Sequence, residues 1–135
     1  MKRLIIMLCM ALPLAVSCAS AKPAAVADLA ARKYVLQSVN GVAFSARERT
    51  PEIEFDENLR VAGQVCNRFM GQGTLRDGVL TVPEMASTMM LCADAQLNDM
   101  EGNLFEMLRQ GADLSLRGNS LILRGGESAY EFARK

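Results

Sequence analysis

The sequence contains no histidine and no tryptophan among its 135 residues. Without histidine, neither a Ser-His nor a Cys-His nucleophile–base pair can form, and the commonest metal ligand is missing. Carboxylates or lysine could still support acid–base chemistry, but no motif in the sequence assembles them. We therefore expect no catalytic residue, no metal site and no cofactor, and we do not expect an enzyme.

A basic excess is also missing, since 15 Lys and Arg residues are balanced by 15 Asp and Glu residues. Removal of Lys2 and Arg3 with a leader leaves 13 basic against 15 acidic residues, and only 5% of residues are aromatic. A protein that follows a phosphate backbone or stacks on bases needs basic and aromatic side chains. Nucleic-acid binding is therefore not expected. The hydrophobic content of 50% is enough for one domain with a buried core.

No apolar run is long enough to cross a bilayer, but the N-terminus has the pattern of a secretion signal. Lys2 and Arg3 precede 13 uncharged, mostly apolar residues from Leu4 to Val16. A membrane-spanning helix needs about 20 apolar residues, whereas the apolar region of a signal peptide is shorter. We expect residues 1–17 to be a signal peptide.

Cys18 follows the sequence Ala15-Val16-Ser17, which is similar to the lipobox of bacterial lipoproteins, although Ala15 stands where Leu is usual. In such proteins the cysteine is acylated, and several acyl chains hold a protein stably on a membrane. Ala19, in place of Asp, indicates an outer-membrane lipoprotein facing the periplasm, with residues 18–32 as an alanine-rich tether. The alternative is cleavage after Ala19-Ser20-Ala21, which would release a soluble periplasmic protein. Lipid attachment at Cys18 is the favoured interpretation.

Two cysteines remain after the signal and the lipid-attachment site, Cys66 and Cys92. An oxidising envelope favours a disulfide between them, which would add about 3–4 kcal/mol on the chain-entropy model. The alternative is a pair of buried free thiols. Two cysteines without histidine cannot complete a zinc site unless carboxylates join them. No histidine is present to activate Cys66 as a nucleophile.

Alternating apolar and polar residues predict seven or eight strands after residue 32. Turn pairs such as Asn40-Gly41 and Asp77-Gly78 separate them, and Asp-Gly permits a tight hairpin. The segments from which these seven or eight strands are expected are 33–39, 52–55, 60–65, 72–76, 79–82, 113–117, 120–124 and 127–134, and the apolar segment 85–92 could be another.

One long helix is predicted between Asp94, a suitable N-cap, and Gly111, a suitable stop. Its apolar residues fall at helical spacing and form a stripe that we expect to be core. Those residues are Leu97, Met100, Leu104 and Leu108, with Phe105 and Met107 beside them. Gly102 inside the helix costs about 1 kcal/mol relative to alanine. An antiparallel sheet wrapped around this helix, in a mostly β, α+β fold, would cover both apolar faces.

Several stretches of the domain resemble the META domain family, in the same order along the chain. They are Tyr34–Gly41, Pro51–Phe55, Cys66–Gly71, Thr88–Cys92, Met107-Leu108 in the helix and Leu121 in a late strand. The family often has Arg where Met89 stands, so a role of that Arg does not carry over. The resemblance extends from Tyr34 to Phe132 and identifies residues 33–135 as a META-like domain.

This resemblance implies a small, partly open β-barrel with one α-helix, and a lipoprotein-type signal is common among such proteins. It also implies an association with heat shock and with resistance to novobiocin. No reaction is established for the domain, so the resemblance implies tolerance of envelope stress without a mechanism.

The sharpest local motif is Cys66–Gly71, which makes Asn67, Arg68, Phe69 and Gly71 a candidate binding loop. In that interpretation Asn67 and Arg68 offer hydrogen-bond donors to an anionic or peptide ligand. The alternative, which we favour, is a structural corner in which Asn67 and Gly71 take turn conformations and Phe69 is buried.

Two further groups of residues invite a functional interpretation. Glu52, Glu54 and Asp56 would share one face of a strand, but Ca²⁺ needs six or more oxygens, so a solvated outer face is expected. Four methionines could form an adaptable apolar surface, but core filling is the expected explanation. These methionines are Met85, Met89, Met90 and Met100.

Two hypotheses about function follow. The first is a non-catalytic, monomeric envelope protein that binds a protein or peptide partner and supports tolerance of heat and of novobiocin-like antibiotics. The second is a small-molecule binder that holds a drug or lipid-like ligand in the mouth of the barrel. A deep apolar pocket would favour the second hypothesis, and a filled barrel with an exposed apolar patch would favour the first.

Overall fold

The computed structural model describes residues 24–45 and 47–135. The expected signal peptide, Cys18 and the Ala19-Ser20-Ala21 site lie outside these residues. In the part of the chain that is described, no helix is long and apolar enough to cross a membrane.

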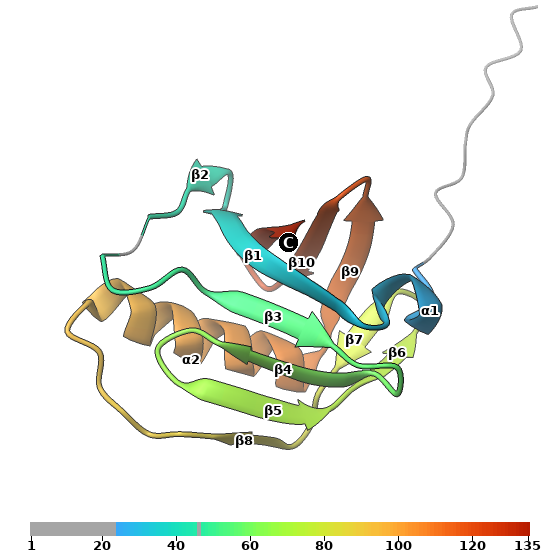
Figure 1. The fold of residues 1–135 in the computed structure, drawn as a ribbon, viewed down its shortest axis with the longest axis horizontal. Helices are drawn as coiled ribbons and strands as arrows, with labels where there is room; N and C mark the ends of the chain where they lie inside the picture. The colour runs from blue at the N-terminus through green and yellow to red at the C-terminus, as the bar shows by residue number, and fades with distance from the viewer. Residues whose placement is uncertain (1–23, 46) are drawn as a thin grey trace, which may run out of the picture.

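Within the described ranges, eleven strands form one antiparallel sheet that curls into a half-barrel (Figure 1). The strands are β1 (Arg32–Val39), β2 (Val42–Ala43), β3 (Glu52–Phe55), β4 (Arg60–Gln64), β5 (Arg68–Gln72), β6 (Thr74–Arg76), β7 (Val79–Thr81), β8 (Met85–Ser87), β9 (Ala112–Arg117), β10 (Ser120–Gly125) and β11 (Ser128–Arg134). Their order is β6-β7-β9-β10-β11-β1-β3-β4-β5-β8, with β2 paired to β1. The two ends of this order, β6 and β8, do not pair with each other, so the barrel is partly open. This agrees with the expected mostly β fold.

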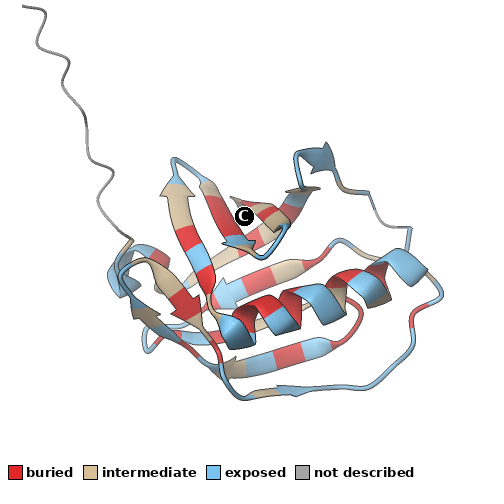
Figure 2. Cartoon of the chain, turned by 180° about the vertical axis from the view of Figure 1, so that it is seen from behind, coloured by how far each residue is buried: buried red, intermediate tan, exposed pale blue. Residues whose placement is uncertain are grey.

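Helix α2 (Ala95–Gln110) lies against the concave side of the sheet, and a short helix α1 (Val26–Leu29) precedes β1 (Figure 1). Figure 2 shows that buried and exposed residues alternate along α2, so that one side of the helix joins the core. The buried residues are Leu97, Met100, Leu104, Phe105, Met107 and Leu108. The interior of the half-barrel is therefore filled with side chains.

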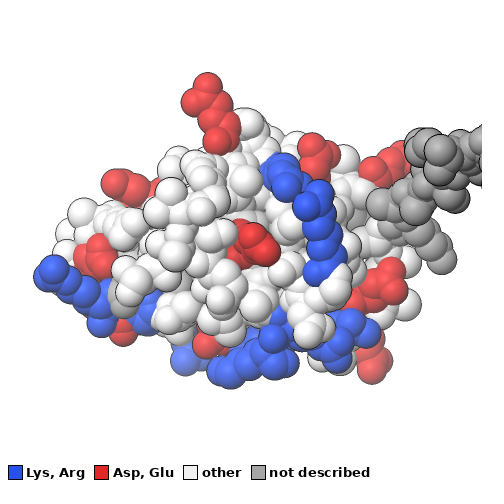
Figure 3. Space-filling model, turned by 90° about the horizontal axis from the view of Figure 1, so that it is seen from above, with Lys and Arg blue, Asp and Glu red and all other residues white. Residues whose placement is uncertain are grey.

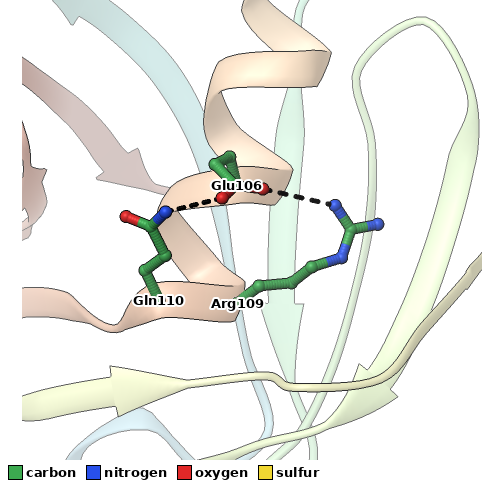
Figure 4. A network of polar contacts seen from close by, with 3 residues as sticks. All are labelled: Glu106, Arg109 and Gln110. Carbon is green, nitrogen blue, oxygen red and sulfur yellow. Dashed lines mark hydrogen bonds and ion pairs between the residues drawn. The ribbon is translucent and has the colours of Figure 1, made fainter.

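The predicted ends of α2 are confirmed. The side chain of Asp94 accepts a hydrogen bond from the N–H of Gln96 at 3.0 Å. Gly111 has a φ of 112° and donates its N–H to the carbonyl of Met107. Near this end, Glu106 accepts a bond from Gln110 at 2.6 Å and lies 3.9 Å from Arg109 (Figure 4). Because these polar side chains are exposed, the network contributes little to stability.

The structure has more strands than expected, and two local predictions are wrong. The segment 85–92 is a strand only as far as Ser87. The corner predicted at Cys66–Gly71 is a bend at Cys66 and Asn67, as expected, but strand β5 begins at Arg68, so Gly71 is not in a turn. A Cβ on Gly71 would lie 2.6 Å from Cγ1 of Val82, in the connection between β7 and β8, so close packing requires glycine there. The turn at Gly71 was predicted wrongly because a glycine inside a strand looks the same in the sequence as a glycine in a turn.

The folded domain begins before residue 33. Leu29 in α1 is fully buried and belongs to the core, and β1 starts at Arg32. Residues 26–32, which were expected to be part of the tether, therefore contribute to the folded domain. These residues join the domain because the apolar side chain of Leu29 is buried in the core. The sequence did not indicate this, because the residues around Leu29 are rich in alanine.

Candidate partner-binding surface

A disulfide joins Cys66, just before β5, to Cys92, just before α2. The two cysteines are 26 residues apart, and both are buried. This bond holds the chain between β8 and α2 against the start of β5. The structure therefore contains the disulfide that the sequence favoured over two buried free thiols.

Asn67, beside the disulfide, is the one buried polar side chain among the residues described, with 4% of its surface exposed. Its Oδ1 accepts hydrogen bonds from the N–H of Met90 at 2.6 Å and from the hydroxyl of Thr88 at 3.0 Å. Its Nδ2 donates to the carbonyl of Met90 at 3.0 Å and to Oε1 of Glu101 at 2.7 Å. All of the polar capacity of the side chain is therefore used inside the protein, as burial requires.

The carboxamide of Asn67 pairs with both backbone groups of Met90, as a peptide group of a neighbouring strand would. Next to this contact, the N–H of Thr88 donates to the carbonyl of Arg68, the residue after Asn67, at 3.0 Å. The N–H of Asn67 also donates to Oε2 of Glu101 on α2, at 2.5 Å. Sheet-like pairing therefore continues past the end of β8 and fixes the backbone of Thr88–Leu91, which we call the display segment.

The display segment presents three apolar side chains to solvent. Met89 is 96% exposed, Met90 56% and Leu91 88%. The expectation that the methionines fill the core is wrong for Met89 and Met90 and right for Met100, which is buried. The backbone bonds to Asn67 hold this segment at the surface, where its side chains have no core to enter.

The candidate binding loop divides into residues with different surroundings. The donors of Asn67 are bonded inside the protein. Arg68 is exposed on β5. Phe69 is buried and packs edge-on against Phe105 of α2, with ring centroids 5.0 Å apart. Because only Arg68 faces solvent, these residues do not converge on one ligand.

The acidic residues of β3 point away from the core. Glu52 forms an ion pair with Lys33, and Glu54 is exposed. Asp56 accepts hydrogen bonds from the N–H groups of Asn58 and Arg60, at 2.9 and 2.7 Å. In residues 24–45 and 47–135, no cluster of three or more Cys, Asp or Glu side chains could hold a metal ion. Figure 3 shows acidic and basic side chains on the same face of the molecule, with uncharged surface between them.

A hollow of about 400 Å³ separates the display segment from one side of α2. We call it the α2 groove; it is lined by Asn67, Ser87, Thr88, Met89, Met90, Leu91, Asn98, Glu101, Gly102 and Phe105. Sequence reasoning missed this groove because its two walls come from segments that share no motif. The uncharged run from Met85 to Cys92 was the one signal that could have indicated it.

Comparison with known proteins agrees with this fold. Residues 27–135 match the model of the META domain. Heat shock protein HslJ of Escherichia coli (strain K12) is 43% identical over 91 residues, which is 67% of this chain and 65% of HslJ. The chain thus matches about 65% of the length of that relative.

Two structures solved by NMR are also similar. One has a TM-score of 0.75 and 36% identity, over 82% of this chain and 94% of its own. The other, from Burkholderia xenovorans, has a TM-score of 0.64 over 93% of this chain and 99% of its own, and at 19% identity it shows the fold alone. The match of the family model covers most of the chain, and the chain therefore belongs to the META domain family.

Proposed function

We propose that this protein is a non-catalytic envelope protein of the HslJ type that binds a protein or peptide partner through the display segment. The observation that carries the proposal is the exposure of Met89, Met90 and Leu91 on a backbone fixed by Asn67 and a disulfide. Adjacent exposed apolar side chains on a monomer mark interaction sites. A rigid backbone lowers the entropy that binding would cost.

The cellular role in this proposal is tolerance of heat and other envelope stress, including resistance to novobiocin-like antibiotics. The name of the relative HslJ supports the heat-shock part. The proposed location is the outer membrane, with a lipid on Cys18. Replacing Cys18 with Ala should abolish fatty-acid labelling of the protein, and persistent labelling would show that the anchor lies elsewhere.

A small molecule inside the barrel is the weaker hypothesis. The interior of the half-barrel is occupied by a core that includes Tyr34, Phe132 and Leu104, each no more than 2% exposed. The hollows on the described part of the molecule lie on its surface. By the criterion of a filled barrel with an exposed apolar patch, these observations favour the partner-binding hypothesis.

Photo-crosslinking in living cells tests the proposal. A photoreactive amino acid at Leu91 should form a specific crosslinked species during heat stress. Val42 on β2 is the matched control, because it is an apolar residue that is also exposed, at 71%, but lies outside the display segment. Equal crosslinking from Val42 and Leu91 would show that the display segment is not a specific site.

Complementation of a deletion strain adds a functional readout. A double variant, Met89→Ser with Leu91→Ser, should fail to restore heat tolerance, because it removes apolar surface without touching a buried residue. Val42→Ser should restore tolerance fully. If the double variant also restores it fully, the display segment has no part in the function.

A further inference from the structure

The backbone from Met85 to Leu91 has hydrogen-bond donors free on alternate residues. β8 ends the sheet and is paired on one side, with β5. Because Thr88 and Arg68 are a hydrogen-bonded pair, the N–H groups of Met85 and Ser87 point away from β5. The edge of the sheet therefore offers unpaired backbone groups at a spacing of two residues.

The same alternation continues through the display segment. The N–H groups of Met90 and Cys92 donate to Asn67 and Asn98. Those of Met89 and Leu91 make no hydrogen bond within the described chain. The chain runs from Thr88 to Cys92 without a turn or bend. Met85–Leu91 is therefore one extended edge, which we call the open edge, and alternate donors on it are free.

The open edge lacks the devices that usually protect an edge strand. It contains no charged residue and no proline over seven residues. Natural proteins protect such edges with charges, proline, bulges or a covering element, because a bare apolar edge pairs with other chains. The edge at the opposite end of the sheet, β6, carries Arg76 and is followed by Asp77. Pro83 and Glu84 come directly before the open edge, so the unprotected stretch begins at Met85.

Gly102 opens the other wall of the α2 groove. Glycine is disfavoured inside a helix. No packing contact requires it here, since a Cβ at this position would meet no atom within 4 Å. Gly102 is exposed and lines the groove between Asn98 and Phe105, which occupy the same side of α2. A glycine that packing does not need, in the wall of an apolar groove, leaves room for the backbone of another chain.

Acidic residues predominate around the α2 groove. Glu101 is the one charged residue that lines it. The chain from Glu84 to Leu108, which supplies most of both walls, has no Lys or Arg. Its acidic residues are Glu84, Asp94, Asp99, Glu101 and Glu106. Two arginines lie beside the groove: Arg68 pairs with Thr88, and Arg109 lies over the ring of Phe105, 6.0 Å from its centroid. Because the acidic residues outnumber these two arginines, the potential near the groove favours a cationic partner.

We propose that the open edge binds an extended, apolar polypeptide segment that carries Lys or Arg, which adds as a strand in the α2 groove. The backbone of the segment pairs with the free groups of Met85, Ser87, Met89 and Leu91. Its side chains on one face contact Phe105 and the space at Gly102, and its basic residues lie near the acidic N-terminal half of α2. In strand addition of this kind, main-chain hydrogen bonds supply affinity and side-chain contacts supply specificity. The inference rests on the proposed function and gives the chemistry of the partner.

Three fluorescent peptides test the proposal against the mature protein, by anisotropy at low salt. The first alternates Val and Thr and has Lys at both ends. The second has Glu at both ends, and the third is the Lys peptide with N-methyl groups on alternate amides. The Lys peptide should bind, and the N-methylated peptide should bind at least about tenfold more weakly, because it cannot pair with an edge. The Glu peptide should also bind more weakly, and added salt should weaken the Lys peptide.

Gly102→Leu tests the groove in the protein itself. Leucine favours the helix more than glycine does, so the variant should remain folded. The new side chain should fill the groove and weaken binding of the Lys peptide about tenfold. Asn103→Leu, which places the same side chain one residue further along an exposed part of α2, should leave binding unchanged.

The outcomes separate this inference from the proposed function. Equal binding of the N-methylated peptide would overturn strand addition, and unchanged binding to Gly102→Leu would overturn the groove. Equal binding of the Glu peptide would overturn the preference for a basic segment. Each of these results leaves crosslinking at Leu91 intact. No binding of any peptide would overturn the inference, and the absence of a crosslink in cells would overturn the proposed function.

Discussion

Replacing Asn67 with Ala tests whether one buried carboxamide holds the display segment in place. The side chain makes three hydrogen bonds to neutral groups, on Thr88 and Met90, and one to the carboxylate of Glu101. Such bonds contribute about 1 kcal/mol each when neutral and about 1.5–3 kcal/mol when one partner is charged. Since Thr88 and Met90 are exposed, water replaces part of what they lose. We therefore expect the free energy of unfolding to fall by about 2–4 kcal/mol.

Urea denaturation followed by circular dichroism, with the disulfide intact, measures this loss. Asn103→Ala is the control, because Asn103 is exposed on α2, and it should change stability by less than about 0.5 kcal/mol. Hydrogen exchange supplies a local readout. The amide of Met90 should be protected in the wild type, those of Met89 and Leu91 should not, and the protection of Met90 should disappear in Asn67→Ala.

A loss below about 1 kcal/mol, no larger than expected for a single ordinary hydrogen bond, would refute the reasoning. So would a protected Met90 amide in the variant. Either result would mean that the disulfide alone fixes the segment and that Asn67 does not act as a substitute for a neighbouring strand.

Three further predictions concern stability. Gly102→Ala should raise the free energy of unfolding by about 0.5–1 kcal/mol, because helix propensity improves and the new methyl group meets nothing within 4 Å; a destabilised variant in thermal melts would contradict this. Replacing Cys66 and Cys92 together with Ser should cost about 2–4 kcal/mol, since the bond closes a loop of 26 residues, and reduction of the wild type should lower its urea midpoint similarly. Burial raises the pKa of both Tyr34 and Tyr130. The unfolded chain therefore loses these protons first, so stability should be present below about pH 10 and fall as the pH rises through the folded pKa values; tyrosinate absorbance that appears well before unfolding would contradict this.

The sequence predicted most of the fold where the signal was local. The strand from residue 33 to 39, the Asp77-Gly78 hairpin and the C-terminal meander all occur as strands β1, β6–β7 and β9–β11. Asp94 and Gly111 could be predicted as the ends of α2, because helix capping and chain reversal depend on backbone groups that are close in the sequence. The disulfide between Cys66 and Cys92, which the sequence favoured over two free thiols, also occurs in the structure.

The display segment and the α2 groove depend on contacts between distant segments, which the sequence does not show. Met89 and Met100 have the same side chain, yet one is exposed and the other is buried. What separates them is the position of the backbone, and around Met89 that position is fixed by Asn67, which reaches Met90 across 23 residues and Glu101 across 34. Periodicity and composition report short-range preferences, whereas burial is decided by which distant segments meet. For this protein, sequence alone predicted most of the strands and the helix and favoured the disulfide, and only the tertiary structure decided that an uncharged segment forms an open edge beside a groove.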